Sequence, residues 1–460
     1  MKKVKIFVAA LAAAVVAISF AACGEKCASG HSYGEWTVTV AATCTEDGTE
    51  TRKCSVCDKE ETRPIAKLGH NYEYAEMIFA ADGKTAQAKY VCSHDATHTK
   101  MHDATVTAAV KTAATCEAKG TTTYTATYDG HSATKDVVDI DALGHNYGDP
   151  VYAERDGKLV TVRKCSRCDV EDVKEVENGV AVRTWDELAT AVKTNNAYIV
   201  LMNDIAKAGA TDFNIRPDGS DLNLTIDLNG KTIGAEVNTC TTWQGVPDCG
   251  YKLTVKILNG TIGTENGYIP GEKIAKNRIY YGVLLDGVGV DLTVENATLL
   301  GYYGGFYTNG SNAGSTVRMS DCKIKGANAD SGASYLAGGH TVTFDRCTFD
   351  GNFGLYIKSG AVTLNDCAVR ATGAYEQPNY KGDGADGGGS GIVVDSVKGY
   401  TPSLTFVMNG GSIVSANGYA FEQVVTKGDN YSTSTLDGVS MTAGKDQNVF
   451  VTTEGAVTVR

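Results

Sequence analysis

One pattern is written three times in this chain: STVRMSDCKIKG (315–326), HTVTFDRCTFDG (340–351) and GAVTLNDCAVRA (360–371). In each copy two apolar residues alternate with polar ones, a cysteine follows after three residues, and a last apolar residue comes two positions later. Period-two alternation indicates a β-strand, and the three-residue step indicates a bend before a second strand. The cysteines lie 25 and 20 residues apart, and copies at such spacings stack as rungs, so the sequence predicts a solenoid.

The same frame extends in both directions along the chain. It fits near 226–233, 255–262, 292–299, 406–413 and 436–441. On these repeats the chain resembles the right-handed parallel β-helix family, the pectate-lyase-like architecture. The resemblance concerns the fold alone, and we expect an all-β solenoid of about eight to nine rungs over 178–460.

Aligned positions on successive rungs form columns about 4.8 Å apart. We expect the column Cys322, Cys347 and Cys367 to point inward as small apolar filler rather than to form a reactive or metal-binding ladder. The residues just before it make a second column: Asn259, Asn296, Asp321, Arg346 and Asp366. Asn and Asp tolerate the left-handed conformation of a tight bend, and Arg346 can pair with Asp321 and Asp366.

A helix is expected where the solenoid begins. Thr184-Trp185-Asp186-Glu187 is a capping-box sequence, and the residues after it carry apolar side chains at helical spacing. The helix would cover the open edge of the first rung. The stretch 198–205 is then predicted as the first buried strand.

The amino terminus has the layout of an export signal. Three lysines precede an apolar run that ends SFAACG, which resembles a bacterial lipobox with Cys23 as the lipidated residue. The sequence therefore predicts a signal peptide over 1–22, a lipidated linker over 23–30, and a protein held by its lipid at the outer face of the cell membrane. Plain export and a membrane span are the alternatives.

Four small β repeats are predicted between the anchor and the solenoid, as a stalk. The stretches GHSY (30–33) and GHNY (69–72, 144–147) mark unit starts, and a degenerate start fits at His102. The expected repeats span about 31–69, 70–101, 102–144 and 145–177. Their sequences resemble cysteine-bearing repeats on surface proteins of gut-type Gram-positive anaerobes. This resemblance implies no biochemical activity.

Cysteines and histidines of these repeats have the composition of a structural zinc site. The candidate ligands are Cys44, Cys54, Cys57 and His70, with Cys165 and Cys168 in the last repeat. Disulfides and plain thiols remain alternatives, because the second and third repeats lack the full set. We expect no cofactor to be required, and calcium is not expected.

Composition suits an exported, turn-rich β protein. The chain has 52 glycines among 460 residues and a net charge of −12, which becomes −15 without the three lysines of the signal. A negative chain disfavours nucleic acid as a partner. We expect a monomer whose partners are the membrane, through the lipid, and a glycan or surface-protein ligand.

Two features of the sequence help to decide whether the protein is an enzyme or a binding protein. The best acidic cluster, Asp383, Asp386 and Asp395, lacks a full ligand or acid–base set. Aromatic pairs recur 22 residues apart, about one turn, and suggest an exposed platform made of Tyr280, Tyr281, Tyr302, Tyr303 and Tyr307. We therefore expect a non-catalytic surface lipoprotein that binds extended ligands. A polysaccharide lyase or glycoside hydrolase is the first alternative, and a structural envelope protein the second.

Overall fold

The computed structural model describes residues 27, 30–242, 248–270, 277–310, 312–328, 330–378, 388–397, 404–427, 432–452 and 456–460. They divide into two compact units. The first unit runs to Asn146 and includes Ser166–Cys168, and the second comprises Tyr147–Cys165 and Asp169–Arg460. Cys23 and the expected signal peptide lie outside the described residues.

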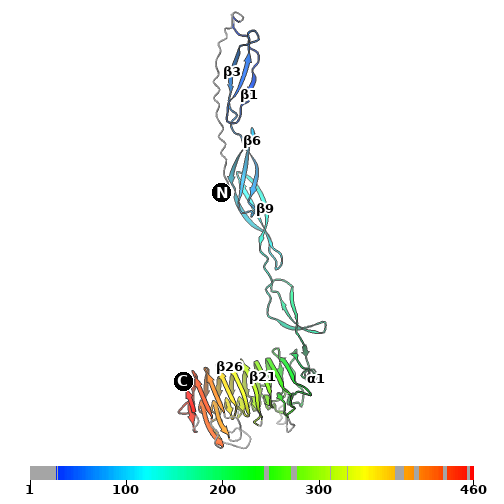
Figure 1. The fold of residues 1–460 in the computed structure, drawn as a ribbon, viewed down its shortest axis with the longest axis vertical. Coiled ribbons are helices and arrows are strands. Elements are labelled where there is room, and N and C mark those ends of the chain that lie inside the picture. Colours follow the sequence, from blue (N-terminus) through cyan, green and yellow to red (C-terminus); the bar gives the residue numbers. More distant parts are fainter. Residues whose placement is uncertain are drawn as a thin grey trace. The chain divides into compact units, whose positions relative to one another are not determined.

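The region before the solenoid consists of three-stranded antiparallel sheets joined in meander order. Three belong to the first unit and the fourth to the second (Figure 1). Their strands are β1 (Thr37–Val40), β2 (Gly48–Lys53), β3 (Glu60–Ile65); β4 (Tyr72–Phe79), β5 (Ala86–Cys92), β6 (Asp95–Asp103); β7 (Thr105–Thr112), β8 (Gly120–Tyr128), β9 (His131–Ile140); and β10 (Val151–Arg155), β11 (Lys158–Lys164), β12 (Glu171–Glu175).

Each GHSY or GHNY stretch lies beside the central strand of its own sheet. Tyr33 bridges to Cys54, Tyr72 pairs with Cys92, and Tyr147 bridges to Cys165, all antiparallel. The start expected at His102 is wrong, because β6 continues to Asp103 and His102 belongs to the last strand of the second sheet.

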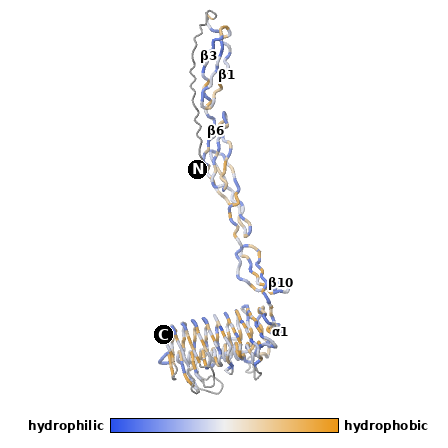
Figure 2. The backbone as a smooth tube through the Cα atoms, viewed as in Figure 1, coloured by the Kyte–Doolittle hydropathy of each residue, from blue (hydrophilic) through white to orange (hydrophobic). Residues whose placement is uncertain are grey.

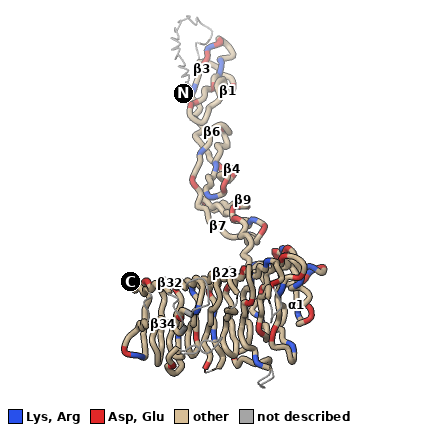
Figure 3. Tube along the Cα trace, turned by 60° about the horizontal axis from the view of Figure 1, so that its bottom comes forward, with Lys and Arg blue, Asp and Glu red and all other residues tan. Residues whose placement is uncertain are grey.

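The second unit holds a right-handed parallel β-helix, as the rung pattern predicted. Two sheets of the described residues, with seventeen and nine strands, form three walls. The rung-to-rung pairings of the described residues are parallel, as in Val342↔Val362. Two of them contain a register shift, one near Ala313 and one near Asp395. Apolar and polar residues alternate along the turns in Figure 2, and residues of both charge signs are interspersed along the helix in Figure 3.

The three walls are made of the following strands. The first wall contains β13 (Gly179–Val182), β14 (Ala197–Leu201), β16 (Leu222–Asp227), β19 (Leu253–Ile262), β21 (Val290–Gly301), β23 (Ala313–Ser320), β26 (Gly339–Asp345), β29 (Ala361–Asn365), β32 (Thr405–Asn409), β35 (Thr433–Asp437) and β38 (Ala456–Val459). The second wall contains the ends of β19 and β21 with β17 (Thr232–Ile233), β24 (Lys323–Gly326), β27 (Thr348–Gly351), β30 (Ala368–Ala371), β33 (Ser412–Ser415) and β36 (Ser440–Thr442). The third wall contains β15 (Asp212–Ile215), β18 (Glu236–Cys240), β20 (Tyr281–Asp286), β22 (Gly304–Thr308), β25 (Ser334–Leu336), β28 (Leu355–Ile357), β31 (Ile392–Val397), β34 (Phe421–Lys427) and β37 (Val449–Val451).

The two predicted columns are confirmed at the bend between the first and second walls. Cys322, Cys347 and Cys367 are buried in the core. The five bend residues have φ between 50° and 57°, Arg346 included. Arg346 makes a bidentate pair with Asp321, at 2.7 and 2.8 Å. The second expected pair, with Asp366, is not among the ion pairs of the described residues.

The capping helix is also confirmed. Helix α1 (Trp185–Ala191) begins after Thr184, whose side chain accepts from the Glu187 amide while Glu187 accepts from the Thr184 amide. Leu188 of this helix is buried at the end of the solenoid core. Strand β14, within the stretch predicted as the first buried strand, is mostly buried but ends at Leu201. The sequence did not predict β13, a partly buried strand that precedes the helix and pairs in parallel with β14.

Candidate functional sites

A pair of exposed tyrosines lies directly before two neighbouring strands of the third wall. Tyr280 and Tyr303 immediately precede β20 and β22, and the Tyr303 amide donates to the Tyr280 carbonyl at 2.9 Å. Their rings are parallel within 7° with centroids 5.5 Å apart, and their exposed fractions are 45% and 38%. The backbone register of the solenoid therefore stacks two aromatic rings at the surface.

The other predicted tyrosines have different surroundings. Tyr281 stacks on Tyr307, with centroids 4.3 Å apart, and both are only partly exposed. Tyr302 is partly exposed beneath the guanidinium of Arg278, which lies 4.2 Å from its ring centroid. Only two of the five predicted platform residues are therefore well exposed, because the remaining three are engaged in packing. Arg278 was not anticipated, and its Nη1 lies 3.5 Å from the Tyr303 hydroxyl oxygen.

The third wall also carries a buried charge cluster. Lys358 Nζ lies 3.8 Å from Asp395 Oδ2, and both side chains are almost completely buried. Tyr356 donates to the same carboxylate at 2.9 Å, and the Thr426 amide donates to its other oxygen at 2.9 Å. Tyr356 packs in an apolar cluster separate from the solenoid core, so this group lies on the outer side of the third wall.

A second carboxylate of this wall is buried as well. Glu422 accepts hydrogen bonds from Ser390 at 2.7 Å and from Tyr375 at 3.1 Å. Burial raises the pKa of this carboxyl. Both carboxylates are thus sequestered by hydrogen bonds, and Asp395, proposed from sequence as a catalytic candidate, is fully buried. Asp383 and Asp386, the other two candidates, lie outside the described residues.

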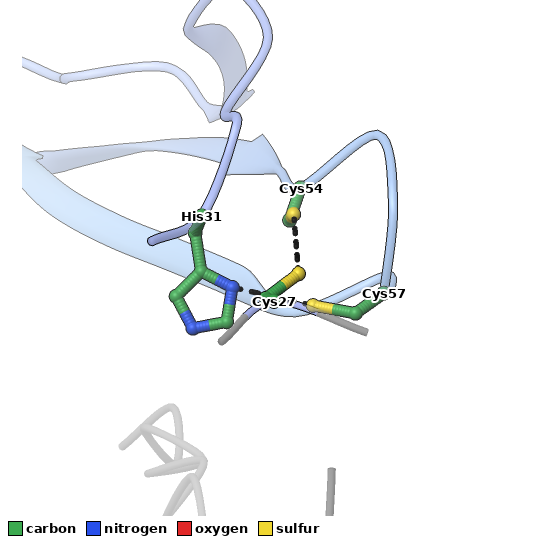
Figure 4. A group of neighbouring side chains, drawn as sticks. All are labelled: Cys27, His31, Cys54 and Cys57. Atoms are coloured by element: carbon green, nitrogen blue, oxygen red, sulfur yellow. Dashed lines mark hydrogen bonds between the residues drawn. The ribbon is translucent and has the colours of Figure 1, made fainter. Parts of the chain in front are cut away.

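The first cysteine–histidine group is composed of Cys27, His31, Cys54 and Cys57 (Figure 4). Their ligand atoms all lie within 4.8 Å of one another. The Sγ atoms of Cys27 and Cys54 are 3.7 Å apart, and Cys57 Sγ is 3.3 Å from His31 Nδ1. A hydrogen bond from the backbone of Val56 is the main cause that lowers the pKa of Cys54 to about 6, which favours the thiolate.

The second group is composed of Cys44, His70 and Cys92, again with ligand atoms within 4.8 Å. The two Sγ atoms are 3.7 Å apart. Two further side chains with ligand atoms lie nearby. The His98 ring centroid is 4.7 Å from that of His70, and Asp95 Oδ2 lies 3.9 Å from His98 Nε2.

A third group lies in the last part of the first unit. Cys116, His145 and Cys168 hold their ligand atoms within 4.8 Å of one another, and Cys168 Sγ is 3.4 Å from His145 Nδ1. Cys165, predicted as a ligand with Cys168, is a buried residue of the second unit.

The grouping differs from that expected within single repeats. Cys44 and His70 do not join Cys54 and Cys57, because they belong to the next group along the chain. Sequence reasoning missed Cys27 and Cys92 as partners. The available signal was the order cysteine, then GH, then cysteine, which recurs across repeat boundaries rather than inside them.

Comparison with known families agrees with the geometry of the second unit. Residues 263–448 match a family model described as a right handed beta helix region. This part of the chain is a right-handed β-helix. The match covers less than half of the 460 residues. A search of curated proteins found no match. No helix among the described residues is long and apolar enough to cross a membrane.

Proposed function

We propose that this chain is an exported, lipid-anchored surface protein whose β-helix binds an extended glycan through Tyr280 and Tyr303. The exposed tyrosine pair is the observation that carries the proposal. Folding alone does not require two large aromatic rings to remain at the surface, and such rings are typical contact residues of recognition sites.

The geometry of the pair favours a sugar over a purely apolar ligand. Because the rings stack on one another, part of one face of each ring is covered, and the ligand meets the remaining faces, the edges and the hydroxyls. Arg278 adds a guanidinium beside the Tyr303 hydroxyl. Apolar ring surface next to hydrogen-bond donors matches a saccharide, which has apolar C–H faces and a rim of hydroxyls.

The net charge favours a neutral glycan. The whole chain carries −12, so a polyanionic chain would be repelled at long range. Neighbouring rungs are separated by about 4.8 Å. A wall of several rungs is therefore long enough to bind an extended ligand that runs along the solenoid. The predicted lipid at Cys23 would present this wall at the outer face of the membrane.

The buried cluster makes an enzyme the weaker proposal. A polysaccharide lyase or hydrolase needs carboxylates or a base that can reach the substrate. Asp395 and Glu422 are instead fully buried and hydrogen-bonded to Tyr356, Ser390 and Tyr375. These contacts are those of a structural cluster.

The test is retention of the purified chain on immobilised neutral polysaccharides, with analysis for new reducing or unsaturated ends. We expect retention without cleavage, and a loss of affinity of about tenfold or more in Tyr280→Ala and Tyr303→Ala. Tyr251→Ala is the matched control, because Tyr251 has an exposed fraction of 38%, equal to that of Tyr303. Cleavage, or equal losses in all three variants, would refute the proposal.

A further inference from the structure

We propose that the cysteine–histidine groups of the first unit are tetrahedral zinc-type sites that tie each small sheet to the segment before it. The first site is formed by Cys27, His31, Cys54 and Cys57, and the second is built on Cys44, His70 and Cys92. These sites are structural and separate from the tyrosine pair.

Interatomic distances carry the proposal. A tetrahedral Zn²⁺ with Zn–S of about 2.3 Å and Zn–N of about 2.0–2.1 Å separates two sulfurs by about 3.8 Å, and a sulfur from a nitrogen by about 3.5 Å. The two sulfur–sulfur distances are both 3.7 Å. The sulfur–nitrogen distance in the first site is 3.3 Å. A disulfide would bring its sulfurs to about 2.05 Å, so the thiols are spaced as ligands.

The ligand types select the metal. Three thiolates and one imidazole make a closed site for a borderline-soft ion that accepts tetrahedral geometry, which fits Zn²⁺ and excludes Ca²⁺ and Mg²⁺. A full set of four protein ligands leaves no position for substrate or water. The first site is therefore structural rather than catalytic.

The second site has three ligands in place and two candidates for the fourth position. Asp95 lies three residues after Cys92, where the first repeat has Cys57 three residues after Cys54. The alternative is His98, whose Nδ1 is buried and has no hydrogen-bond partner among the described residues. A buried imidazole nitrogen without a partner is costly, and coordination would satisfy it.

The first sheet has almost no apolar core. Between residues 30 and 70 the buried apolar side chains of the described chain are those of Cys44 and Cys54. All four residues of β1 are exposed, as are five of the six residues of β3. So small a sheet buries too little apolar surface to be stable alone, and a metal supplies folding free energy directly.

The junction without cysteines is built differently. Between the second and third sheets the ring of Tyr74 stacks on His131 with centroids 3.8 Å apart, and His102 stacks on Tyr128 at 5.0 Å. Lys135 also donates to the Ala80 carbonyl at 2.6 Å. Aromatic packing at this junction takes the place of the metal ligands. The lack of a full cysteine set in the third repeat is therefore compatible with metal sites at the other junctions.

The test uses the detergent-solubilised full chain, reduced and stripped of metal, then titrated with Co²⁺ and afterwards with Zn²⁺. We expect the intense visible absorption of tetrahedral Co²⁺–thiolate centres, at least two metal equivalents, and displacement by Zn²⁺. Cys57→Ser and Cys92→Ser should each remove about one equivalent, because each eliminates a ligand of a different site. Cys249→Ser, a half-buried cysteine of the β-helix, is the control and should leave the metal content unchanged.

A second variant separates ligation from mere loss of folding. His31→Cys keeps four ligands and should retain the metal while it shifts the Co²⁺ spectrum toward that of a four-thiolate centre. Two results would overturn the proposal. One is a chain isolated without metal and with Cys27–Cys54 and Cys44–Cys92 disulfides in peptide maps. The other is Co²⁺ binding that Cys57→Ser, Cys92→Ser and His31→Cys all leave unchanged.

Discussion

The Sγ atoms of Cys44 and Cys92 lie 3.7 Å apart although 48 residues and a repeat boundary separate them. Cys44 follows β1 and Cys92 ends β5, so the contact joins two sheets that share no strand. The contact therefore links the first two sheets through side chains alone.

Metal removal should accordingly affect the two units differently. We expect a strong chelator to make residues 30–100 sensitive to protease, because the first two sheets lose their shared ligands. The β-helix should resist, since its core runs without interruption from Val182 to Leu436. Limited proteolysis with mass spectrometry measures both regions in one sample. Equal sensitivity with and without chelator would contradict a stabilising metal.

Arg346 provides a test of the bend column. Its φ is 52°, which costs an L-residue about 1–2 kcal/mol, while its exposed pair with Asp321 is worth about 1 kcal/mol or less. Arg346→Gly should therefore change the free energy of unfolding by no more than about 1 kcal/mol. Arg346→Val loses the pair and adds the extra strain of a β-branched side chain at positive φ, and should cost about 2 kcal/mol in chemical denaturation. A larger loss for glycine than for valine would refute the explanation.

Glu236 should make the β-helix less stable at alkaline pH. Its side chain accepts from the Tyr281 amide at 3.0 Å, and burial is the main cause that raises its pKa to about 8. The folded state thus prefers the protonated carboxyl. This contribution is complete below the unfolded pKa of about 4.5 and is lost as pH rises through about 8.

Glu236→Gln should remove this pH dependence. The shift corresponds to an upper bound of about 5 kcal/mol, so the variant should gain stability at pH 9 and change little at pH 4. Unfolding curves at the two pH values measure the difference. A variant that is destabilised equally at both would show that the carboxyl is ionised in the folded protein.

The Lys358–Asp395 pair should be structural. Asp395→Ala removes the carboxylate beside a buried ammonium and should cost about 3–5 kcal/mol. Asp350→Ala is the control, because Asp350 and Arg370 are separated by the same 3.8 Å but are exposed. That variant should cost less than about 1 kcal/mol. Similar losses in the two variants would show that burial does not set the strength of these pairs.

The β-helix could be predicted from the sequence because each rung repeats the same local sequence features. Apolar alternation, a small inward residue and a left-handed bend recur at every turn, so the column of Asn259, Asn296 and Asp321 can be recognised from residue types and spacing alone. Strand β13 was missed because it precedes the helix and carries none of the rung pattern.

The sites were harder to predict, for a physical reason. Sequence gives neighbours along the chain, whereas Cys27 and Cys92 meet their partners across repeat boundaries. Exposure is equally non-local, since Tyr281 and Tyr303 look alike in sequence, yet Tyr281 packs on Tyr307 and Tyr303 remains at the surface. The burial of Asp395 likewise depends on side chains from other strands, among them Lys358 and Thr426.

Side-chain footprinting would show whether the β-helix binds a glycan at its tyrosine pair. The full chain would be oxidatively labelled with and without the neutral polysaccharide that retains it. We predict protection of Tyr280 and Tyr303, with Tyr251 labelled equally in both samples. Unchanged labelling of the pair, with protection elsewhere on the β-helix, would contradict binding at these two rings.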